Sequence, residues 1–152
     1  MVDRRPFSTF NFLVEISVEG IADQVCAAAF SECDGLELSI EPKTFHQGGL
    51  NTEQVHLAGP VSYGQLTLKR GMSQDLGLWQ WFNEVMQTNQ RGLRGQAKIV
   101  WQNAAQQNQM QFTLKDCLPI KLRAPALNAQ EGGIAIEEMQ LVYAALTMEV
   151  LK

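Results

Sequence analysis

The start of the chain shows a strict alternation of apolar and polar positions. From Phe10 to Val18 every even-numbered residue is apolar. Side chains two residues apart share one face of a strand, so this segment predicts a long strand with one buried face. Leu36–Ile40 alternates in the same way and predicts another strand, which Pro42 ends. Val25–Phe30 fits a strand, but its three alanines leave a helix open, because six residues are too few to decide.

Further short strands are expected along the rest of the chain. The final segment changes phase: Ile134 and Ile136 share one parity, whereas Met139 and Leu141 share the other. One extra residue turns all later side chains over, so we predict a β-bulge within one long strand, Ile134–Val150. The other predicted pieces are Gln65–Arg70, Lys98–Gln102, Met110–Leu114 and Ile120–Ala124.

One segment has helical spacing. Ser73 is the expected N-cap, and Asp75 suits the positive end of a helix in the first turn. Asn89 and Gly92 stand where the helix should stop. We expect the apolar stripe to be core packing rather than a cofactor site; it consists of Leu76, Trp79, Phe82, Val85 and Met86.

Between the third strand and Gln65 the pattern is lost. Lys43–Gly64 holds Gly48-Gly49 and Gly59-Pro60, with few apolar anchors. A stretch of this length without an element predicts a functional loop or one that a partner orders.

These elements predict a mainly β domain (α+β) spanning residues 1–152. We expect an antiparallel sandwich or partly closed barrel of about seven strands with one packed helix. Long strands at both ends of the chain leave sheet edges open, and Ala144, Ala145 and Thr147 do not protect the last one. Open edges and an unanchored loop indicate self-assembly, in which head-to-tail contacts close into rings.

Charge and composition exclude several classes of protein. The 152 residues include 12 basic and 16 acidic side chains, a net charge of −4, and the basic ones are scattered. Specific nucleic-acid binding needs clustered cations, so we do not expect it. No apolar run approaches the length that crosses a bilayer, which argues against stable membrane insertion. The basic N-terminal residues lead into no apolar signal region, so we expect synthesis in the cytoplasm.

The cysteines fit no metal or redox motif. Cys26, Cys33 and Cys117 are too far apart for a paired motif, and we expect reduced, buried thiols. Asp34 follows Cys33 directly, and its negative charge disfavours a nucleophilic thiolate.

Other candidate chemistry is equally sparse. His46 and His56 both lie in the glycine-rich segment, but no carboxylate or thiol at useful spacing supports a metal site. Glu137 and Glu138 are adjacent on a strand and point to opposite faces. We therefore expect no enzyme activity and no cofactor. An enzyme with a metal on the two histidines, and a monomeric ligand-binding β-barrel module, are the alternatives.

Six stretches, taken in order, resemble the contractile phage tail tube family. The likeness covers nearly the whole chain, and its ordered spacing makes it specific. The matching stretches are Phe10–Ile16, Phe30–Glu37, Gln47–Asn51 with Leu57–Gly59, Leu66–Gly71 with Leu78–Trp81, Leu118–Lys121 with Pro125–Ala129, and Ala135–Met139.

The resemblance implies a structural subunit of the inner tube of a contractile tail or contractile injection system. Hexameric rings would stack into a hollow tube, with the strands of all subunits merging into one barrel. The implied partners are the contractile sheath, baseplate and tail-terminator proteins, and a cargo of effector protein or DNA in the lumen. Assembly would take place in the bacterial cytoplasm, and the tube would belong to a phage tail or a phage-tail-like injection particle.

The resemblance also assigns roles to particular residues. The glycine-rich segment would reach the adjacent ring through Phe45, His46, Gln47, Gly48, Gly49, Leu50, Asn51, Val55 and Leu57. Acidic side chains on the channel face would keep cargo from adhering, because like charges repel phosphate. Glu15, Glu37 and Glu137 are the candidates for this lining, and solvation of the outer surface is the alternative.

Overall fold

The computed structural model describes residues 11–19, 26–46, 48–49, 52–72, 75–88, 94–105, 107–125 and 135–151. Its elements, in chain order, are β1 (Asn11–Val18), β2 (Cys26–Phe30), β3 (Glu32–Asp34), β4 (Leu38–His46), β5 (Gln54–Tyr63), β6 (Leu66–Gly71), α1 (Gly77–Thr88), β7 (Gly95–Gln102), β8 (Asn108–Arg123), β9 (Ile136–Val142) and β10 (Ala145–Val150).

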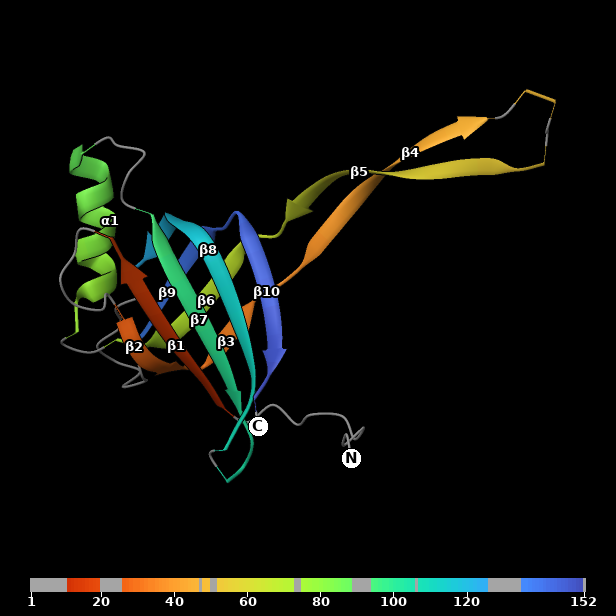
Figure 1. Ribbon diagram of the computed structural model, residues 1–152. Helices are drawn as coiled ribbons and strands as arrows, with labels where there is room; N and C mark the ends of the chain where they lie inside the picture. The colour runs from red at the N-terminus through yellow and green to blue at the C-terminus, as the bar shows by residue number, and fades with distance from the viewer. Residues whose placement is uncertain are drawn as a thin grey trace.

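Eight of the strands form one antiparallel sheet. Its order is β2-β1-β7-β8-β9-β6-β3, and β10 also pairs with β8. The two ends of this order are consecutive along the chain, since only Ser31 separates β2 from β3. The Ser31 backbone N–H donates a hydrogen bond to the Lys69 carbonyl oxygen at 2.8 Å. The sheet therefore curls back towards itself, which confirms the predicted antiparallel, sandwich-like fold with a packed helix (Figure 1).

The core lies between the inner faces of this curled sheet. Val14 and Ile16 of β1 are fully buried, whereas Glu15 and Ser17 between them are exposed, as the alternation predicted. β2 pairs with β1 from Cys26 to Phe30, so this segment is a strand and the helical alternative is wrong. The apolar side chains buried with them include Leu66, Leu68, Ala97, Ile99, Leu114, Met139 and Leu141.

The longest strand, β8, joins two segments that the sequence predicts as separate strands. It has 16 residues and includes both Met110–Leu114 and the piece beyond Pro119, which were predicted as separate elements. The first half of β8 pairs with β7 and β10, and the second half pairs with β9. Asp116, at the junction, has a positive φ of 55°. The register also shifts between Pro119 and Lys121, where a residue without an N–H is tolerated.

The final segment is two strands rather than one strand with a bulge. β9 and β10 are separated by Tyr143 and Ala144, which lie opposite the bend of β8. The Ala144 N–H donates to the Lys115 carbonyl oxygen at 2.9 Å, so the chain stays attached to β8 through the break. The change of parity between Ile136 and Met139 lies within the unbroken β9, where Ile136 is 41% exposed and Met139 is buried, so the predicted bulge between them is wrong.

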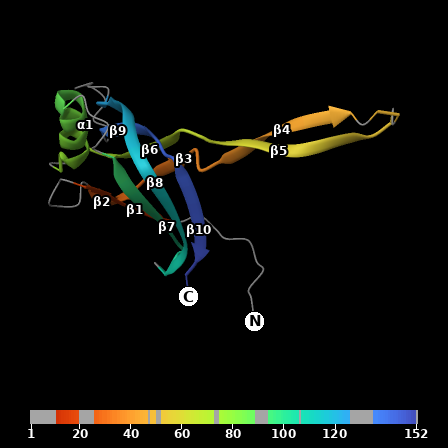
Figure 2. The ribbon, with the colours of Figure 1, turned by 45° about the horizontal axis from the view of Figure 1, so that its top comes forward.

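The segment predicted as an unanchored loop is a long β-hairpin. Among the described strands, β4 and β5 pair only with each other, and they project away from the sheet (Figures 1 and 2). Pro42 does not end the strand, because it lies beside a shift in register where the ladder is already interrupted.

The helix was predicted in the right place but with the wrong buried face. α1 begins at Gly77, whose N–H donates to Asp75 Oδ1 at 3.0 Å, so Asp75 is the cap; Ser73, Asn89 and Gly92 lie outside the described residues. Leu78 and Trp81 are buried, whereas Leu76 and Met86 are 47% and 62% exposed. Trp79, Phe82 and Val85 are half-buried. The helix buries a narrow stripe at Leu78 and Trp81, three residues apart, against the sheet. Leu76 and Met86, at the two ends of the predicted stripe, are therefore exposed to solvent.

Candidate functional site

The β4–β5 hairpin exposes an unusual amount of apolar surface. Six apolar side chains on it are between 38% and 52% exposed: Leu38, Ile40, Phe45, Val55, Leu57 and Val61. A two-stranded hairpin has no core of its own and is at best marginally stable in water. A contiguous apolar surface of this kind marks an interaction site.

A bulge divides the hairpin into two parts. Ile40 lies opposite Val61, but Pro42 lies opposite Ala58, so β5 has one residue more than β4 between these pairs. A Cβ atom on Gly59, within the bulge, would lie only 2.1 Å from the Glu41 carbonyl oxygen. Only glycine fits this close approach of the two backbones, so the bulge is fixed by the sequence.

The apolar residues form two stripes on opposite sides of β4. Before the bulge they are Leu38, Ile40 and Val61, which we call the near stripe; beyond it they are Phe45, Val55 and Leu57, which we call the far stripe. The β4 members change from even to odd positions at the bulge. Because successive side chains alternate across a strand, the two stripes lie on opposite local faces of β4, and the two strands cross between the base and the tip of the hairpin (Figures 1 and 2).

Tyr143 fixes the base of the hairpin. Its hydroxyl donates to the Gly35 carbonyl oxygen at 2.8 Å and accepts from the Glu37 N–H at 3.2 Å. Its ring lies 5.4 Å from the ring of Tyr63, the last residue of β5. Burial raises the pKa of Tyr143 above its ordinary value, which keeps the hydroxyl protonated as a donor. The hairpin is therefore held in a defined direction by a residue from the break between β9 and β10.

Gly35 allows this contact to form. Its φ is +105°, and a Cβ atom there would lie 1.9 Å from the Gln65 carbonyl oxygen. Both the left-handed backbone and the lack of space require glycine at this position.

Two of the remaining predicted inter-ring residues are described at the tip of the hairpin. Gly48 and Gly49 lie in the turn, while Gln47, Leu50 and Asn51 lie outside the described residues. His56 lies opposite Thr44, with Nδ1 3.3 Å from the threonine hydroxyl, and His46 is on the same side of the ribbon. In the described part of the chain, no group of three metal-ligating side chains comes together.

Among the described residues, three strands of the sheet pair with only one other strand: β2, β3 and β10. β10 pairs with β8, and β2 pairs with β1. On β10, Met148 and Val150 are 62% and 64% exposed. An edge strand with unpaired backbone groups and apolar side chains is a template for pairing with another chain.

The outer face of the sheet is polar and balanced in charge. Glu15 lies directly opposite Lys98, which lies opposite Thr113, which in turn lies opposite Thr147. Glu15, Lys98 and Thr147 are exposed, and Thr113 is half-buried. A carboxylate and an ammonium on adjacent strands favour each other. Glu15 thus keeps its predicted exposure and acquires a cationic neighbour.

Of the other two predicted lining residues, one is exposed and one is buried. Glu37 is exposed, next to the base of the hairpin. Glu137 is only 2% exposed and therefore lines no surface. It shares its parity with Met139 and Leu141 and lies with them on the inner face of β9, so the predicted lining role of Glu137 is wrong.

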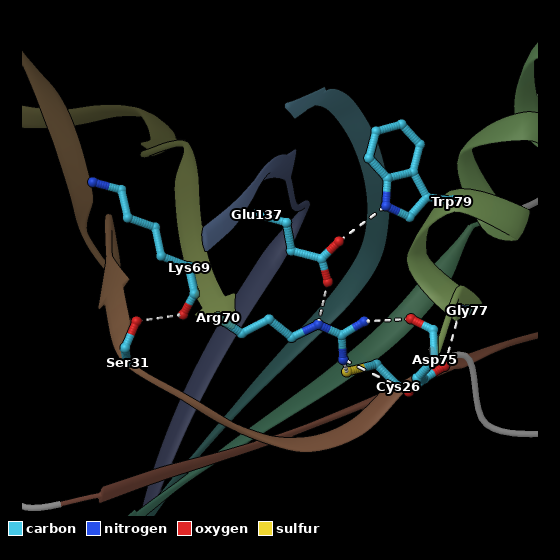
Figure 3. Close-up of polar contacts among 8 residues, drawn as sticks. All are labelled: Cys26, Ser31, Lys69, Arg70, Asp75, Gly77, Trp79 and Glu137. Carbon is cyan, nitrogen blue, oxygen red and sulfur yellow. Dashed lines mark hydrogen bonds and ion pairs between the residues drawn. The ribbon is translucent and has the colours of Figure 1, made fainter. Parts of the chain in front are cut away.

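Glu137 belongs to a buried polar network that joins the helix to the sheet (Figure 3). Its carboxylate pairs with Arg70 Nε at 2.5 Å and accepts a hydrogen bond from Trp79 Nε1 at 2.9 Å. Arg70 also donates to the Asp75 carbonyl oxygen at 3.2 Å, just before α1. Its guanidinium lies 5.4 Å from the centre of the Phe30 ring. The network is structural, because it satisfies both charges inside the protein.

The thiols are inert. Cys26 and Cys117 are buried and Cys33 is partly buried. Burial raises the pKa of Cys26 to about 11 and that of Cys33 and Cys117 to about 12. Asp34 adds to the effect at Cys33, as predicted. Such thiols are poor nucleophiles at neutral pH.

An apolar cavity opens at one end of the folded sheet. Its volume is about 400 Å³, and its lining residues are Phe12, Cys33, Leu36, Ile99, Trp101 and Phe112.

In the described part of the chain, no helix is long and apolar enough to span a bilayer.

Comparisons with known proteins point to one family. Residues 8–147 match the family described as T4-like virus tail tube protein gp19. Curated proteins give no match. The fold is similar to a chain of the anti-feeding prophage baseplate, with a TM-score of 0.82, 24% identity and coverage of 97% of both chains.

Two further structures share the fold. A chain from the sheath-tube complex of PVC, an extracellular contractile injection system, has a TM-score of 0.79 and 21% identity, over 97% of this chain and 94% of that one. Hcp1 from Salmonella typhimurium has a TM-score of 0.56 and 13% identity, over 93% of this chain and 87% of that one.

Proposed function

The chain belongs to the T4-like virus tail tube protein gp19 family, and from this premise we propose that it is the structural subunit of a hollow tube inside a contractile particle. Six copies form a ring, and the rings stack. The observation that carries this proposal is the hairpin, on which six apolar side chains remain 38–52% exposed. Identical copies provide that cover in a tube. Proteins of this family are structural subunits and not enzymes.

The open sheet edges support ring formation. β10 of one copy and β2 of the next would satisfy each other's unpaired backbone groups and extend the sheet around the ring. A head-to-tail contact repeated by a rotation that closes gives a ring without free edges.

The far stripe supports stacking. Phe45, Val55 and Leu57 lie towards the end of the hairpin that projects away from the sheet, where an adjacent ring can cover them (Figure 2). The turn glycines Gly48 and Gly49 lie beyond them. Together with the other predicted residues of this segment, they form the inter-ring contact.

The outer face of β1, β7, β8 and β10 is the channel lining in this proposal. The opposite face of these strands cannot line a channel, because its side chains are buried in the core of the subunit. Glu15 would face the lumen beside Lys98, and Glu37 remains a second candidate. Replacing both acids with lysine should slow the passage of cargo while leaving rings intact; unchanged delivery would remove them from the lining.

A tube inside a contractile particle would also contact other proteins of that particle. A contractile sheath surrounds the tube, baseplate and tail-terminator proteins close its ends, and an effector protein or DNA passes through it. The similar structures come from a baseplate and a sheath-tube complex, which supports this setting. Assembly takes place in the bacterial cytoplasm, within a phage tail or a phage-tail-like injection particle.

Assembly of the purified chain tests the proposal. Native mass spectrometry and negative-stain microscopy over a range of concentrations should show hexameric rings and, at high concentration, rods. Met148→Lys with Val150→Lys places charges on the open edge and should prevent rings, whereas Glu149→Gln on the same strand should not. A species that remains at the 17.0 kDa of one chain under all conditions would contradict the proposal.

The apolar cavity favours a second candidate, a monomeric ligand-binding module. A volume of about 400 Å³ is in the range of small-molecule sites. A stable monomer that binds an apolar fluorescent probe, with loss of binding on Leu36→Arg, would support this candidate against the tube.

A further inference from the structure

We infer that the channel of the proposed tube passes polypeptides and retains DNA, so that its cargo is a polypeptide. This inference rests on the proposed tube function and names the class of cargo. The lining is the outer face of β1, β7, the first half of β8 and β10, which lie side by side in one layer (Figure 1). The sequence predicts acidic side chains on the channel face, whereas the structure places acids and bases there in equal number.

The charges on this face cancel. Among the described residues of the four strands, two acids and two bases lie on it, and all four are exposed: Glu15, Lys98, Lys115 and Glu149. Glu15 lies directly opposite Lys98. Lys115 follows the buried Leu114 of β8 and therefore points outward, and Glu149 lies opposite Gln111 on that side. These four side chains together carry no net charge.

Most other side chains on this face are hydroxyls and amides. They include Ser17, Gln96, Gln111, Thr113 and Thr147. Such groups hydrogen-bond to water and carry no charge. Leu13 and Val100, which lie opposite each other on the same face, are half-buried. The lining is therefore a hydrated surface that is neutral overall.

A hollow at one end of this face repeats the balance. Its volume is about 450 Å³, and its charged lining residues are Glu19, Arg94, Lys115 and Asp116. Acids and bases again occur in equal number, so the hollow adds no excess of either sign to the channel.

Neutrality of this kind does not repel DNA. An exposed pair such as Glu15 and Lys98 is weak, because water screens both charges. DNA presents one negative charge for about every 1.7 Å of its axis, so a phosphate can take the place of Glu15 beside Lys98. Every ring repeats these lysines, and contacts along one polymer reinforce each other. Long DNA is therefore held along the tube, whereas a lining with an excess of acids would repel it.

A polypeptide meets the same lining differently. Its charges have both signs and are spaced irregularly, so attractive and repulsive contacts with the lining offset each other. The lining as a whole has no net field that selects one sign of charge, and its hydroxyl and amide groups stay hydrated. A polypeptide of either net charge can therefore pass without a sustained contact.

Retention of a probe inside assembled tubes tests the inference. Tubes are assembled in the presence of one of three fluorescent probes: a short DNA duplex, an unfolded acidic polypeptide or an unfolded basic polypeptide. The tubes are then diluted and sedimented, and the probe that stays with them is measured at about 50 mM and about 200 mM salt.

Two matched variants locate the contact. Lys98→Gln with Lys115→Gln removes the bases of the lining. Lys121→Gln with Arg123→Gln is the control, because it removes two bases from the second half of β8, which lies off the lining. All four side chains are exposed in the subunit, so both variants should fold. Circular dichroism checks the fold, and negative-stain microscopy checks that tubes form.

The probes should separate by class rather than by sign of charge. We expect wild-type tubes at low salt to retain the duplex at least about tenfold more than either polypeptide, and to release most of it at high salt. Lys98→Gln with Lys115→Gln should lower retention of the duplex by at least about tenfold, whereas the control should match the wild type. The two polypeptides should be retained equally little.

The inference is overturned if the duplex leaves wild-type tubes as freely as the polypeptides do, or if both variants retain it to the same extent. It is also overturned if the basic and acidic polypeptides differ from each other as strongly as the duplex is expected to differ from them. A wild-type chain that forms no tubes contradicts the proposed tube function instead, and microscopy shows this before any probe is added.

Discussion

The Tyr143 hydroxyl donates a hydrogen bond to the Gly35 carbonyl oxygen across a sequence separation of 108 residues. One side chain thereby joins the break between β9 and β10 to the base of the projecting hairpin. The start of β10 and the hairpin are thus held in a fixed relation within each subunit.

Tyr143→Phe should lower the free energy of unfolding by about 1–2 kcal/mol, because a partly buried carbonyl and N–H lose their partner. Urea unfolding at a fixed protein concentration measures the change. Tyr63→Phe is the control, since it keeps the ring contact with Tyr143. Equal stability of the wild type and Tyr143→Phe would show that the hydroxyl contributes nothing.

The same hydroxyl predicts a dependence on pH. Burial raises the pKa of Tyr143 above its ordinary value of 10.0. Above pH 10 the unfolded chain therefore releases this proton before the folded one does, and stability falls as the pH rises. The advantage of the wild type over Tyr143→Phe should be constant from pH 7 to 9 and should shrink above pH 10. An advantage that grows with pH would contradict the assigned environment.

The buried ion pair predicts a strong, non-additive effect. Glu137→Leu or Arg70→Met alone leaves an uncompensated buried charge, which should cost about 3–5 kcal/mol of stability. The double variant should lose less than the sum of the two single losses, because no charge remains. Glu138→Gln, next to it on the opposite face of β9, should change stability by less than about 0.5 kcal/mol. Additive losses in the cycle would show that the pair does not couple.

Two glycines should respond differently to a single methyl group. Gly35→Ala combines a positive φ with a clash against a backbone oxygen, and should cost at least about 3 kcal/mol. Gly48→Ala, at the hairpin tip, meets no atom within 4 Å and should cost less than about 0.5 kcal/mol. Thermal unfolding of the two variants compares them directly, and a tolerated Gly35→Ala would contradict the described turn.

The cysteines should resist alkylation in the folded protein. With pKa values of about 11 to 12, fewer than about one thiol in a thousand is ionised at pH 8. We expect iodoacetamide to label the native chain at least about a hundredfold more slowly than the urea-unfolded chain, as followed by intact mass. Rapid labelling of one native thiol would mean that its surroundings open in solution.

The strands that carry alternation were readable from the sequence, because burial of one face is the cause of the pattern. Val14 and Ile16 show this in β1. The hairpin was missed for the opposite reason. It has no buried face to impose a period, and Pro42, Gly59 and Pro60 are strand breakers whose effect is absorbed by the bulge.

The polar network was harder to predict than the apolar core. Glu137 and Arg70 each share the parity of buried apolar neighbours, but a single charged residue in such a pattern is ordinarily read as exposed. Only the register, which places Arg70 opposite Glu137, shows that they neutralise each other. For the helix, the spacing of apolar residues is compatible with more than one buried face. In the structure, the face that carries Trp81 packs against Gly95 of β7.

β8 runs through both halves of the folded sheet without a break, from Asn108 to Arg123. When a tube is driven through an envelope, its wall is compressed along its length. In this subunit, a load that enters beside β10 reaches β9 through covalent backbone rather than through side-chain contacts that could shear. The two halves of the sheet in each subunit are therefore linked by one continuous strand.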